Sequence, residues 1–538
     1  MFHVEHSKIF YINQNKRISL NKASLIIAAG LLLSRVLGVL REMLLAKIAG
    51  VNEQKNALDL AFMIPDILNH LIGTGFLSII FISLFTTHLL KQDEDEGWRS
   101  FSNIFNVLGS LFLVLAVPAF VFMRELILLL TAAPPSEEIL LMATHFGRII
   151  LPAQLFFFAG SFLIAAQQAK KQFFIPSMTG IIYNASIVFF GWAFRENGVI
   201  GFAYGVPIGA FVGFFVLQIL GSYRSRIKYF FVFKPANAEF IKTLKLLLPM
   251  VLGAGSMFAL EFAIRSFGSL FGNSGISSLN YSYRLMYTLV AVFGFSVGAA
   301  KYPDMVRLFK ENKKAELNEK VWNDLAKIFA ILVPAICALT AVSLPAVRIL
   351  FERGAFTQQN SILVNSLLLC YLPASIGLCF QALLVRAFYS MERMWLPTII
   401  NTSAFAASLF LYAPIAKIAG IYSVPIVSFI CSFVQLFVLL AFWGGIRGQR
   451  PCIRDFITAG ASLAVLAPLG LYLSNYAREW LLSVGLVYLA AYCTLFSFLF
   501  FAASVALQTL LGSKSSSYII FLLKKRIVKS TVNNSKNV

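Results

Sequence analysis

Charged side chains inside long apolar stretches are the residues of this sequence most able to do chemistry. The segment 34–42 reads SRVLGVLRE. At 3.6 residues per turn, its polar and small residues fall within an arc of about 120°; they are Ser34, Arg35, Gly38, Arg41 and Glu42. A charge near the middle of a membrane helix costs on the order of 2.5–3.5 kcal/mol, so it normally faces a partner or a water-filled cavity. We therefore expect this face to line a cavity.

The next apolar stretch carries a second polar face. Its polar residues lie within about 100° of one another, subject to a kink at Pro65; they are Asp59, Asp66, Asn69, His70 and Gly73. The acids Glu42 and Asp59 would limit repulsion between arginines in an empty cavity. They are also candidates to bind a coupling cation, although the sequence identifies no particular ion.

The second half of the chain holds a matching set of polar residues. Glu261 and Arg265 are four residues apart and can pair on one helix face. Asn280, Arg284 and Tyr287 share a face of the following helix. Because arginine presents a planar fork of donors that suits phosphate oxygens, arginines converging from both halves could hold a pyrophosphate.

Cofactor and metal chemistry have no support in the sequence. The five histidines and six cysteines lack the spacings of metal ligands, and the cysteines fall mostly inside apolar runs. We expect no cofactor, no metal site and no disulfide framework.

Composition identifies the elements that must position these residues. Hydrophobic residues make up 59% of the 538, charged residues only 13%, and mean hydropathy is +0.78, whereas soluble chains carry roughly 25% charged residues. A membrane-spanning helix needs about 20 apolar residues. We predict an all-α polytopic membrane protein of about fourteen such helices, over residues 23–48, 58–88, 101–131, 140–168, 176–194, 199–221, 240–271, 277–306, 322–350, 361–388, 395–413, 419–444, 455–475 and 481–511.

Positive charge predicts the orientation. Of the Lys and Arg residues in the breaks and tails, 27 fall on one side of the predicted helices and 5 on the other, Lys55 among the five. Because positive residues stay in the cytoplasm, we expect both termini to be cytoplasmic. The tail 1–22, the linker 222–239 and the basic tail 512–538 would then be cytoplasmic, and no signal peptide is indicated.

An internal repeat divides the chain. A Leu-Pro pair ending at Pro152 is followed by Pro176, and a second Leu-Pro pair ending at Pro373 is followed by Pro397. The equivalent prolines of the two copies are offset by 221 positions. Duplication predicts two six-helix lobes, 23–221 and 240–444, related by a pseudo-two-fold axis along the membrane normal and enclosing a central cleft. The two helices of 455–511 would be an addition.

Several segments resemble one known family. SRVLGVLRE (34–42), YSYRLMYTLVAVFGFSVGAAKYP (281–303), ILFERGAFT (349–357) and the stretch 150–184 are similar to segments of the MurJ/MviN lipid II flippases of the multidrug/oligosaccharidyl-lipid/polysaccharide exporter superfamily. The resemblance implies a V-shaped, alternating-access flippase of the bacterial inner membrane, for an undecaprenyl-pyrophosphate-linked peptidoglycan precursor. It also implies which residues line the central cavity: Arg35, Arg41, Glu42, Asp59 and Arg284. Secondary candidates are Ser34, Asp66, Asn69, His70, Glu261, Arg265 and Asn280.

Some positions depart from the family pattern. Many members carry two arginines and a glutamate where this chain has Asn69, His70 and Thr74. Tyr283 stands where an acidic residue is common, and Thr288 lies where a proline is usual. These differences make the predicted cavity less basic.

The leading hypothesis is therefore a lipid II flippase without covalent chemistry, not an enzyme. Alternatives are an exporter of another polyprenyl-linked glycan or of a cationic drug, a membrane enzyme, and a non-transporting scaffold for cell-wall assembly. The only acidic run, 93–96, is most simply a solvated loop. Expected partners are lipid II or a related glycolipid, membrane lipids and cell-wall synthesis proteins, with no nucleic acid.

Overall fold

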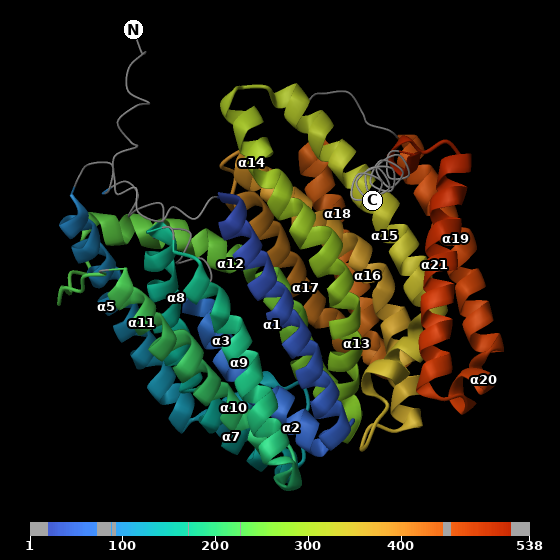
Figure 1. Cartoon of the computed structure of the whole chain (residues 1–538), viewed down its shortest axis with the longest axis horizontal. Helices are drawn as coiled ribbons and strands as arrows, with labels where there is room; N and C mark the ends of the chain where they lie inside the picture. The colour runs from blue at the N-terminus through green and yellow to red at the C-terminus, as the bar shows by residue number, and fades with distance from the viewer. Residues whose placement is uncertain are drawn as a thin grey trace, which may run out of the picture.

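The computed structural model of the chain is a bundle of long, roughly aligned helices (Figure 1). It describes residues 20–72, 88, 93–170, 172–225, 227–444 and 453–517. The candidates Gly73 and Thr74, most of the predicted N-terminal tail and most of the predicted C-terminal tail lie outside these residues.

The first half of the chain forms helices in each of the first six predicted ranges. They are α1 (Leu20–Ala49), α2 (Glu53–Ala61), α3 (Met63–Ile72), α5 (Glu94–Val121), α6 (Met123–Leu130), α7 (Glu137–Ile150), α8 (Ala153–Ala169), α9 (Phe174–Ala193), α10 (Ile200–Ala210) and α11 (Leu217–Arg224). A π-helical turn, η2 (Phe211–Val216), joins α10 to α11, and a short 3-10 turn, η1 (Arg195–Asn197), follows α9.

The second half is built in the same way, with longer continuous helices. They are α12 (Ala238–Gly268), η3 (Ser269–Ser274), α13 (Gly275–Leu289), the π-helical η4 (Val290–Phe295), α14 (Ser296–Lys310), α15 (Lys314–Phe351), α16 (Gln358–Ser390), α17 (Trp395–Ala419), η5 (Gly420–Tyr422) and α18 (Ser423–Gly444). The last helices are α19 (Ile453–Tyr476), α20 (Arg478–Ser483) and α21 (Leu486–Leu510).

The prediction of a polytopic helical membrane protein is confirmed. Within the described residues, 10 helical segments are long and apolar enough to cross a membrane. The longest single helix among them, α15, has 38 residues and a mean hydropathy of 2.3 in its most apolar window.

Prolines account for several of the breaks between helices. Pro65 is the third residue of α3, in the first turn, where its missing N–H removes no intrahelical bond. The α-helix is interrupted at Phe62, three residues before this proline, between α2 and α3. Pro152 similarly follows the end of α7, whereas its counterpart Pro373 lies inside the continuous helix α16.

Helix boundaries recur along the chain at the spacing of the sequence repeat. The end of α6 and the end of α15 are 221 residues apart, and so are the first residues of α7 and α16 and those of α9 and α17. In both α9 and α17 the third residue is proline, Pro176 and Pro397. The chain thus changes direction at equivalent places in its two halves.

Buried apolar residues form three clusters. One is built mainly from α1 to α11, the second from α12 to α18, and the third from α15 with α19 to α21. Figure 1 shows α19 and α21 beside one another at the outer edge of the molecule, next to α15.

Two segments differ from the sequence prediction. The break after α1 is short, because α2 begins at Glu53, and Lys55 is therefore a buried helix residue and not an exposed loop residue. At the other end of the chain, residues that we expected in the tail are held against α19. The Asp455 carboxylate accepts hydrogen bonds from the Lys514 N–H at 2.8 Å and the Ser515 hydroxyl at 2.7 Å.

Candidate substrate-binding site

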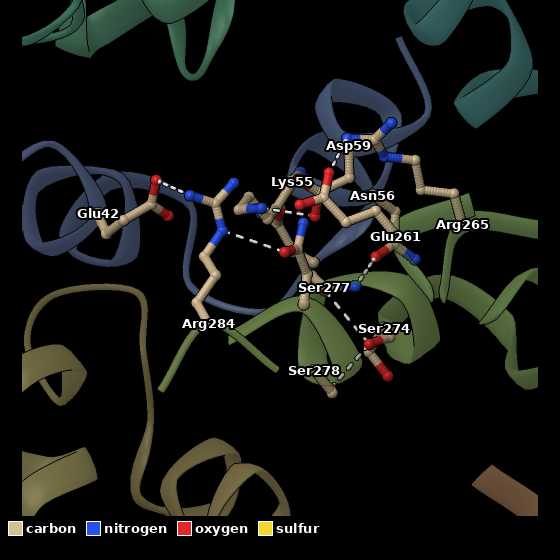
Figure 2. Close-up of polar contacts among 12 residues, drawn as sticks. Glu42, Lys55, Asn56, Asp59, Glu261, Arg265, Ser274, Ser277, Ser278 and Arg284 are labelled. Atoms are coloured by element: carbon tan, nitrogen blue, oxygen red, sulfur yellow. Dashed lines mark hydrogen bonds and ion pairs between the residues drawn. The ribbon is translucent and has the colours of Figure 1, made fainter. Parts of the chain in front are cut away.

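One carboxylate joins the two halves of the molecule near its centre. Glu42, on α1, accepts a hydrogen bond from Arg284 on α13, with 2.6 Å between Oε1 and Nη1. The same oxygen accepts from Nη2 of Arg41 at 2.9 Å. Figure 2 shows the Arg284 side chain extending from α13 toward Glu42 on α1. The predicted convergence of arginines from both halves is thus present for Arg41 and Arg284, with Glu42 between them.

Neighbouring amides complete this Glu42 cluster, which comprises Arg41, Glu42, Asn184, Asn280 and Arg284. Asn280 accepts from Nε of Arg284 at 3.1 Å, and Asn184, on α9, accepts from Nη1 of Arg41 at 3.2 Å. Glu42 is largely buried, with 11% of its side chain exposed, whereas Arg284 keeps 39% exposed. The guanidinium of Arg284 can therefore reach an incoming ligand without leaving the cluster.

Close contact between α1 and α9 holds the first-half members of the cluster. The Asn184 amide donates to the Ser34 hydroxyl at 3.2 Å. A Cβ at Gly180 would lie 2.6 Å from that hydroxyl, and one at Gly30 would lie 2.8 Å from the Ser177 carbonyl oxygen. Glycine at these positions lets the helix backbones approach, which is the usual role of small residues between membrane helices.

Arg35 lies on the same helix but outside the cluster. Its side chain is exposed, and among the described residues no hydrogen bond or ion pair to it is found. Apolar side chains on both sides of it, Leu33 and Val36, are also exposed, at 48% and 52%. Arg35 is thus a free cation one to two helical turns from Arg41 along α1.

The predicted cavity residue Asp59 is instead engaged by a neighbour that the sequence placed in a loop. Lys55 donates to Asp59 at 2.5 Å, and their side chains are 1% and 6% exposed. The Lys55 ammonium also lies 5.0 Å from the centre of the Tyr281 ring, on α13. Lys55 and Asp59 together carry no net charge, and through Tyr281 this pair contacts the second half of the chain.

A third ionic group contains most of the secondary candidates. Arg265, on α12, pairs with Asp66 on α3 at 2.7 Å and with Glu261 at 3.8 Å. The expected Glu261–Arg265 pair exists, but the shorter contact is the one between the two halves. His70 stacks on Phe258 with ring centres 5.1 Å apart, and Asn69 is partly buried.

A small cavity opens between α12 and α13 beside these groups. Its volume is about 190 Å³, and its lining includes Glu261, Arg265, Asn280, Arg284 and Tyr287. Ligand pockets commonly measure about 300–1,000 Å³, so this cavity is too small for a glycolipid headgroup.

Two backbone contacts close the end of the bundle at which α1 finishes, the lower end in Figure 1. The loop before α16 reaches the first half, where the Ala355 N–H donates to the Lys47 carbonyl at 2.9 Å. The loop before α7 reaches the second half, where the Ala132 N–H donates to the Ser266 carbonyl at 3.0 Å. We call these two contacts the clasps.

Another contact between the halves lies beside the clasps. The Asn56 side-chain oxygen accepts from the Ser277 N–H at 2.8 Å, and the two positions are 221 residues apart. The Asn56 amide also donates to the Gly272 carbonyl at 3.3 Å. Figure 2 shows Asn56 and Ser277 facing one another, with Lys55 and Asp59 nearby.

Sequence reasoning missed four residues of this region: Lys55, Asn56, Asn184 and Tyr281. A signal existed for two of them. Lys55 and Asp59 have the spacing of a helical ion pair, and Asn184 is a polar residue four positions after Gly180 inside an apolar run. Asn56 and Tyr281 gain their roles only from contacts with the other half of the chain.

Among the described residues, no group of three or more His, Cys, Asp or Glu side chains is arranged to hold a metal ion. The Glu42 cluster presents the guanidinium groups of Arg41 and Arg284, whose donors suit an anion.

Comparison with solved structures defines the class to which this architecture belongs. The fold is similar to that of the lipid II flippase MurJ in an inward closed conformation, with a TM-score of 0.73 and 21% identity over 90% of this chain and 100% of that one. It is also similar to an inward-facing multidrug resistance MATE transporter of the MOP superfamily, with a TM-score of 0.63 and 16% identity over 79% of this chain and 98% of the other. The chain therefore has the same fold as these two membrane proteins.

The sequence comparisons give the family. The family model described as lipid II flippase MurJ matches residues 45–513, most of the chain. The chain belongs to the lipid II flippase MurJ family, which is a family of transporters and not of enzymes. The resemblance noted in the sequence is thereby confirmed, although its first segment, 34–42, precedes the matched range.

Individual relatives have low sequence identity to this chain but align with it over two thirds of its length or more. The probable lipid II flippase of Bdellovibrio bacteriovorus is 24% identical over 487 residues, which cover 88% of this chain and 92% of the relative. That of Buchnera aphidicola subsp. Acyrthosiphon pisum is 25% identical over 370 residues, covering 68% and 72%.

Proposed function

We propose that this protein moves lipid II, the undecaprenyl-pyrophosphate-linked disaccharide-peptide, from the cytoplasmic to the periplasmic leaflet of the inner membrane by alternating access. The observation that carries the proposal is the sharing of one Glu42 oxygen by Arg41 and Arg284, which come from different halves of the chain. A site of this kind can bind an anion between the halves and change as the halves separate.

The charge of the site suits a pyrophosphate. Within the Glu42 cluster, Arg41 and Arg284 share one carboxylate, which leaves one positive charge in excess, and the exposed Arg35 supplies a second. The neighbouring group of Arg265, Asp66 and Glu261 carries one net negative charge, on the other side of the cavity lining. A pyrophosphate diester is a dianion. Guanidinium groups offer it paired donors, and Glu42 keeps the arginines in place while the site is empty.

The proposed architecture has fourteen membrane helices in two lobes, 23–221 and 240–444, with 455–511 added. The recurrence of helix boundaries at a spacing of 221 residues supports a pseudo-two-fold axis along the membrane normal. The charge bias of the loops supports cytoplasmic termini. In that orientation the clasps close the periplasmic end, and transport requires them to separate.

Flipping by the purified full-length protein in liposomes tests the proposal. Fluorescent lipid II is placed in both leaflets, and an impermeant reductant bleaches the outer one; flipping bleaches the remainder. We expect bleaching to near completion with the wild-type protein and to about half with Arg284→Ala or with empty liposomes. Bleaching that is equal for all three samples would contradict the proposal, and selective movement of another polyprenyl-pyrophosphate glycan would favour the alternative substrate class.

A further inference from the structure

The connection between α11 and α12 is a non-helical segment fastened along α5. We call residues 227–237 the linker loop; it lies at the outer edge of the molecule beside α5 (Figure 1). The Ser102 hydroxyl accepts from the Phe230 N–H at 3.0 Å, and the Asn106 amide donates to the Val232 carbonyl at 2.8 Å. Asn103 bonds both the N–H and the carbonyl of Lys234, at 2.5 and 3.1 Å.

The position of these contacts along α5 gives the depth of the loop. Between Arg99 on α5 and Arg124 on α6 the chain contains no charged residue. At a rise of 1.5 Å per residue, this uncharged stretch is long enough to cross the hydrocarbon core of a membrane, which is roughly 30 Å thick. Asn106 follows Arg99 by seven residues, or about 10 Å along the helix axis. The middle of the linker loop, which is bonded to Asn106, therefore lies deeper in the membrane than Arg99.

A non-helical backbone can enter a membrane only when its polar groups have partners. The linker loop finds such partners on α5: its backbone N–H and carbonyl groups are bonded by the side chains of Ser102, Asn103 and Asn106. This role explains why polar residues occur at the start of the long uncharged stretch of α5. The Tyr229 hydroxyl also donates to the Asn106 side-chain oxygen at 2.8 Å.

Aromatic side chains follow one another along the loop, and three of them are exposed. Tyr229, Phe231 and Phe233 are 56%, 89% and 53% exposed. Phe230 lies between them and is partly buried, with the Arg99 guanidinium 4.6 Å from its ring centre. Lys234 follows the aromatic row, and its side chain is exposed, with no ion pair to another described residue.

We propose that the linker loop is a lipid anchor. Phe231 and Phe233 insert among the acyl chains of one leaflet, and Lys234 contacts the phosphate groups of the phospholipids above them. Aromatic rings with an adjacent cation are the side chains that membrane interfaces favour. The other basic residue of the loop, Lys228, is occupied by Asp95 at 2.5 Å, so Lys234 is the cation available to lipid.

The anchor has a mechanical consequence. Its backbone is tied to α5 in the first half of the chain, and it leads directly into α12 in the second half. It therefore fixes the depth at which the two halves are joined. The insertion of Phe231 and Phe233 into a leaflet does not depend on the proposed function. The identification of that leaflet as the cytoplasmic one rests on the proposed function and orientation.

Spin labelling of the full-length protein in vesicles of phosphatidylethanolamine and phosphatidylglycerol tests the anchor. A label is placed at Phe231→Cys and, as the matched control, at Ala236→Cys, an exposed position of the same loop beyond the aromatic row. The parent protein, labelled in parallel, gives the background of the native cysteines. We expect the label at 231 to collide mainly with oxygen and the label at 236 mainly with a water-soluble nickel chelate.

Equal access of the nickel chelate to both positions would overturn the proposal. Adding Asn103→Ala and Asn106→Ala should shift the label at 231 toward the nickel chelate, because the backbone loses its partners. A measurement that needs no cysteine uses a photoreactive benzoylphenylalanine at 231 or 236. The expected product at 231 is a phospholipid adduct, while a protein adduct or an unmodified chain at 231 would count against the anchor.

Discussion

The Oε1 atom of Glu42 lies 2.6 Å from Nη1 of Arg284, although 242 residues separate the two in the chain. This contact joins α1 to α13 across the centre of the molecule, and Arg41 shares the same oxygen. A ligand anion that competes for Arg284 therefore also changes what holds the two halves together. In the proposed mechanism, binding and rearrangement are therefore linked through this one carboxylate.

Arg284 should be required for binding in a way that depends on its fork of donors. A hydrogen bond to a charged group contributes about 1.5–3 kcal/mol, so Arg284→Ala should reduce the apparent affinity for lipid II by roughly tenfold to a hundredfold. Arg284→Lys should recover only part of it, since an ammonium group cannot bind bidentately. Titration of lipid II against the purified variants measures this, and full recovery by lysine would show that charge alone matters.

Arg35 should separate activity from stability. Its side chain is exposed and has no partner among the described residues, so Arg35→Ala should leave the melting temperature unchanged while lowering the flipping rate. Lys417→Ala removes another exposed cation, near the end of α17, and is the matched control. The proposed role of Arg35 would be wrong if both variants flipped lipid II at the wild-type rate.

The buried pair of Lys55 and Asp59 should behave as a unit. Removing one partner of a buried ion pair costs about 3–5 kcal/mol, and we expect Lys55→Met and Asp59→Asn each to lower the melting temperature strongly. The double variant should be more stable than either single variant, because no unpaired charge remains. Arg124→Met, in a pair whose side chains are 41% and 63% exposed, should have little effect. Additive losses in the double variant would refute the coupling.

Part of this arrangement could be predicted from the sequence and part could not. Helix ranges followed from hydropathy, and Glu42 and Arg284, which meet in the structure, were singled out by their position on polar helix faces. Lys55 was misplaced because a cation beside a predicted helix end normally lies in a loop. Glu261 was correctly predicted to pair with Arg265, but the closer partner, Asp66, could not be found, because it belongs to the other half of the chain and no local spacing relates the two.

The clasps should have to open during transport. A disulfide between Ala133→Cys and Ser269→Cys, where the Ala133 N–H now donates to the Ser269 hydroxyl at 3.0 Å, would hold the lower end shut. We expect oxidation to stop flipping and reduction to restore it. Each single cysteine variant serves as a control, and continued flipping by the oxidised double variant would exclude opening at this end.

Gly354 should be needed for the clasp between the second-half loop and α1. Its φ is 59°, and an added Cβ would lie 2.2 Å from the Lys47 carbonyl oxygen. Gly354→Ala therefore adds a clash to the left-handed backbone penalty of about 1–2 kcal/mol. At Gly420, φ is 55° and ψ is −136°, outside the left-handed helical region, and nothing lies within 4 Å of a Cβ, so Gly420→Ala shows the cost of a backbone conformation unfavourable to alanine without a clash. Equal melting temperatures for the two variants would argue against a tight clasp.

The contact between Asn56 and Ser277 has an evolutionary implication. On the duplication proposed above, both positions descend from one residue of an ancestral half-length chain. In a symmetric dimer of that ancestor, this residue would have met its own copy across the dimer axis. Fusion of the genes freed the two copies to diverge, so that one now contributes a side-chain acceptor and the other a backbone donor. A single chain can thus hold an asymmetric contact at its centre, which two identical subunits could not form on the axis itself.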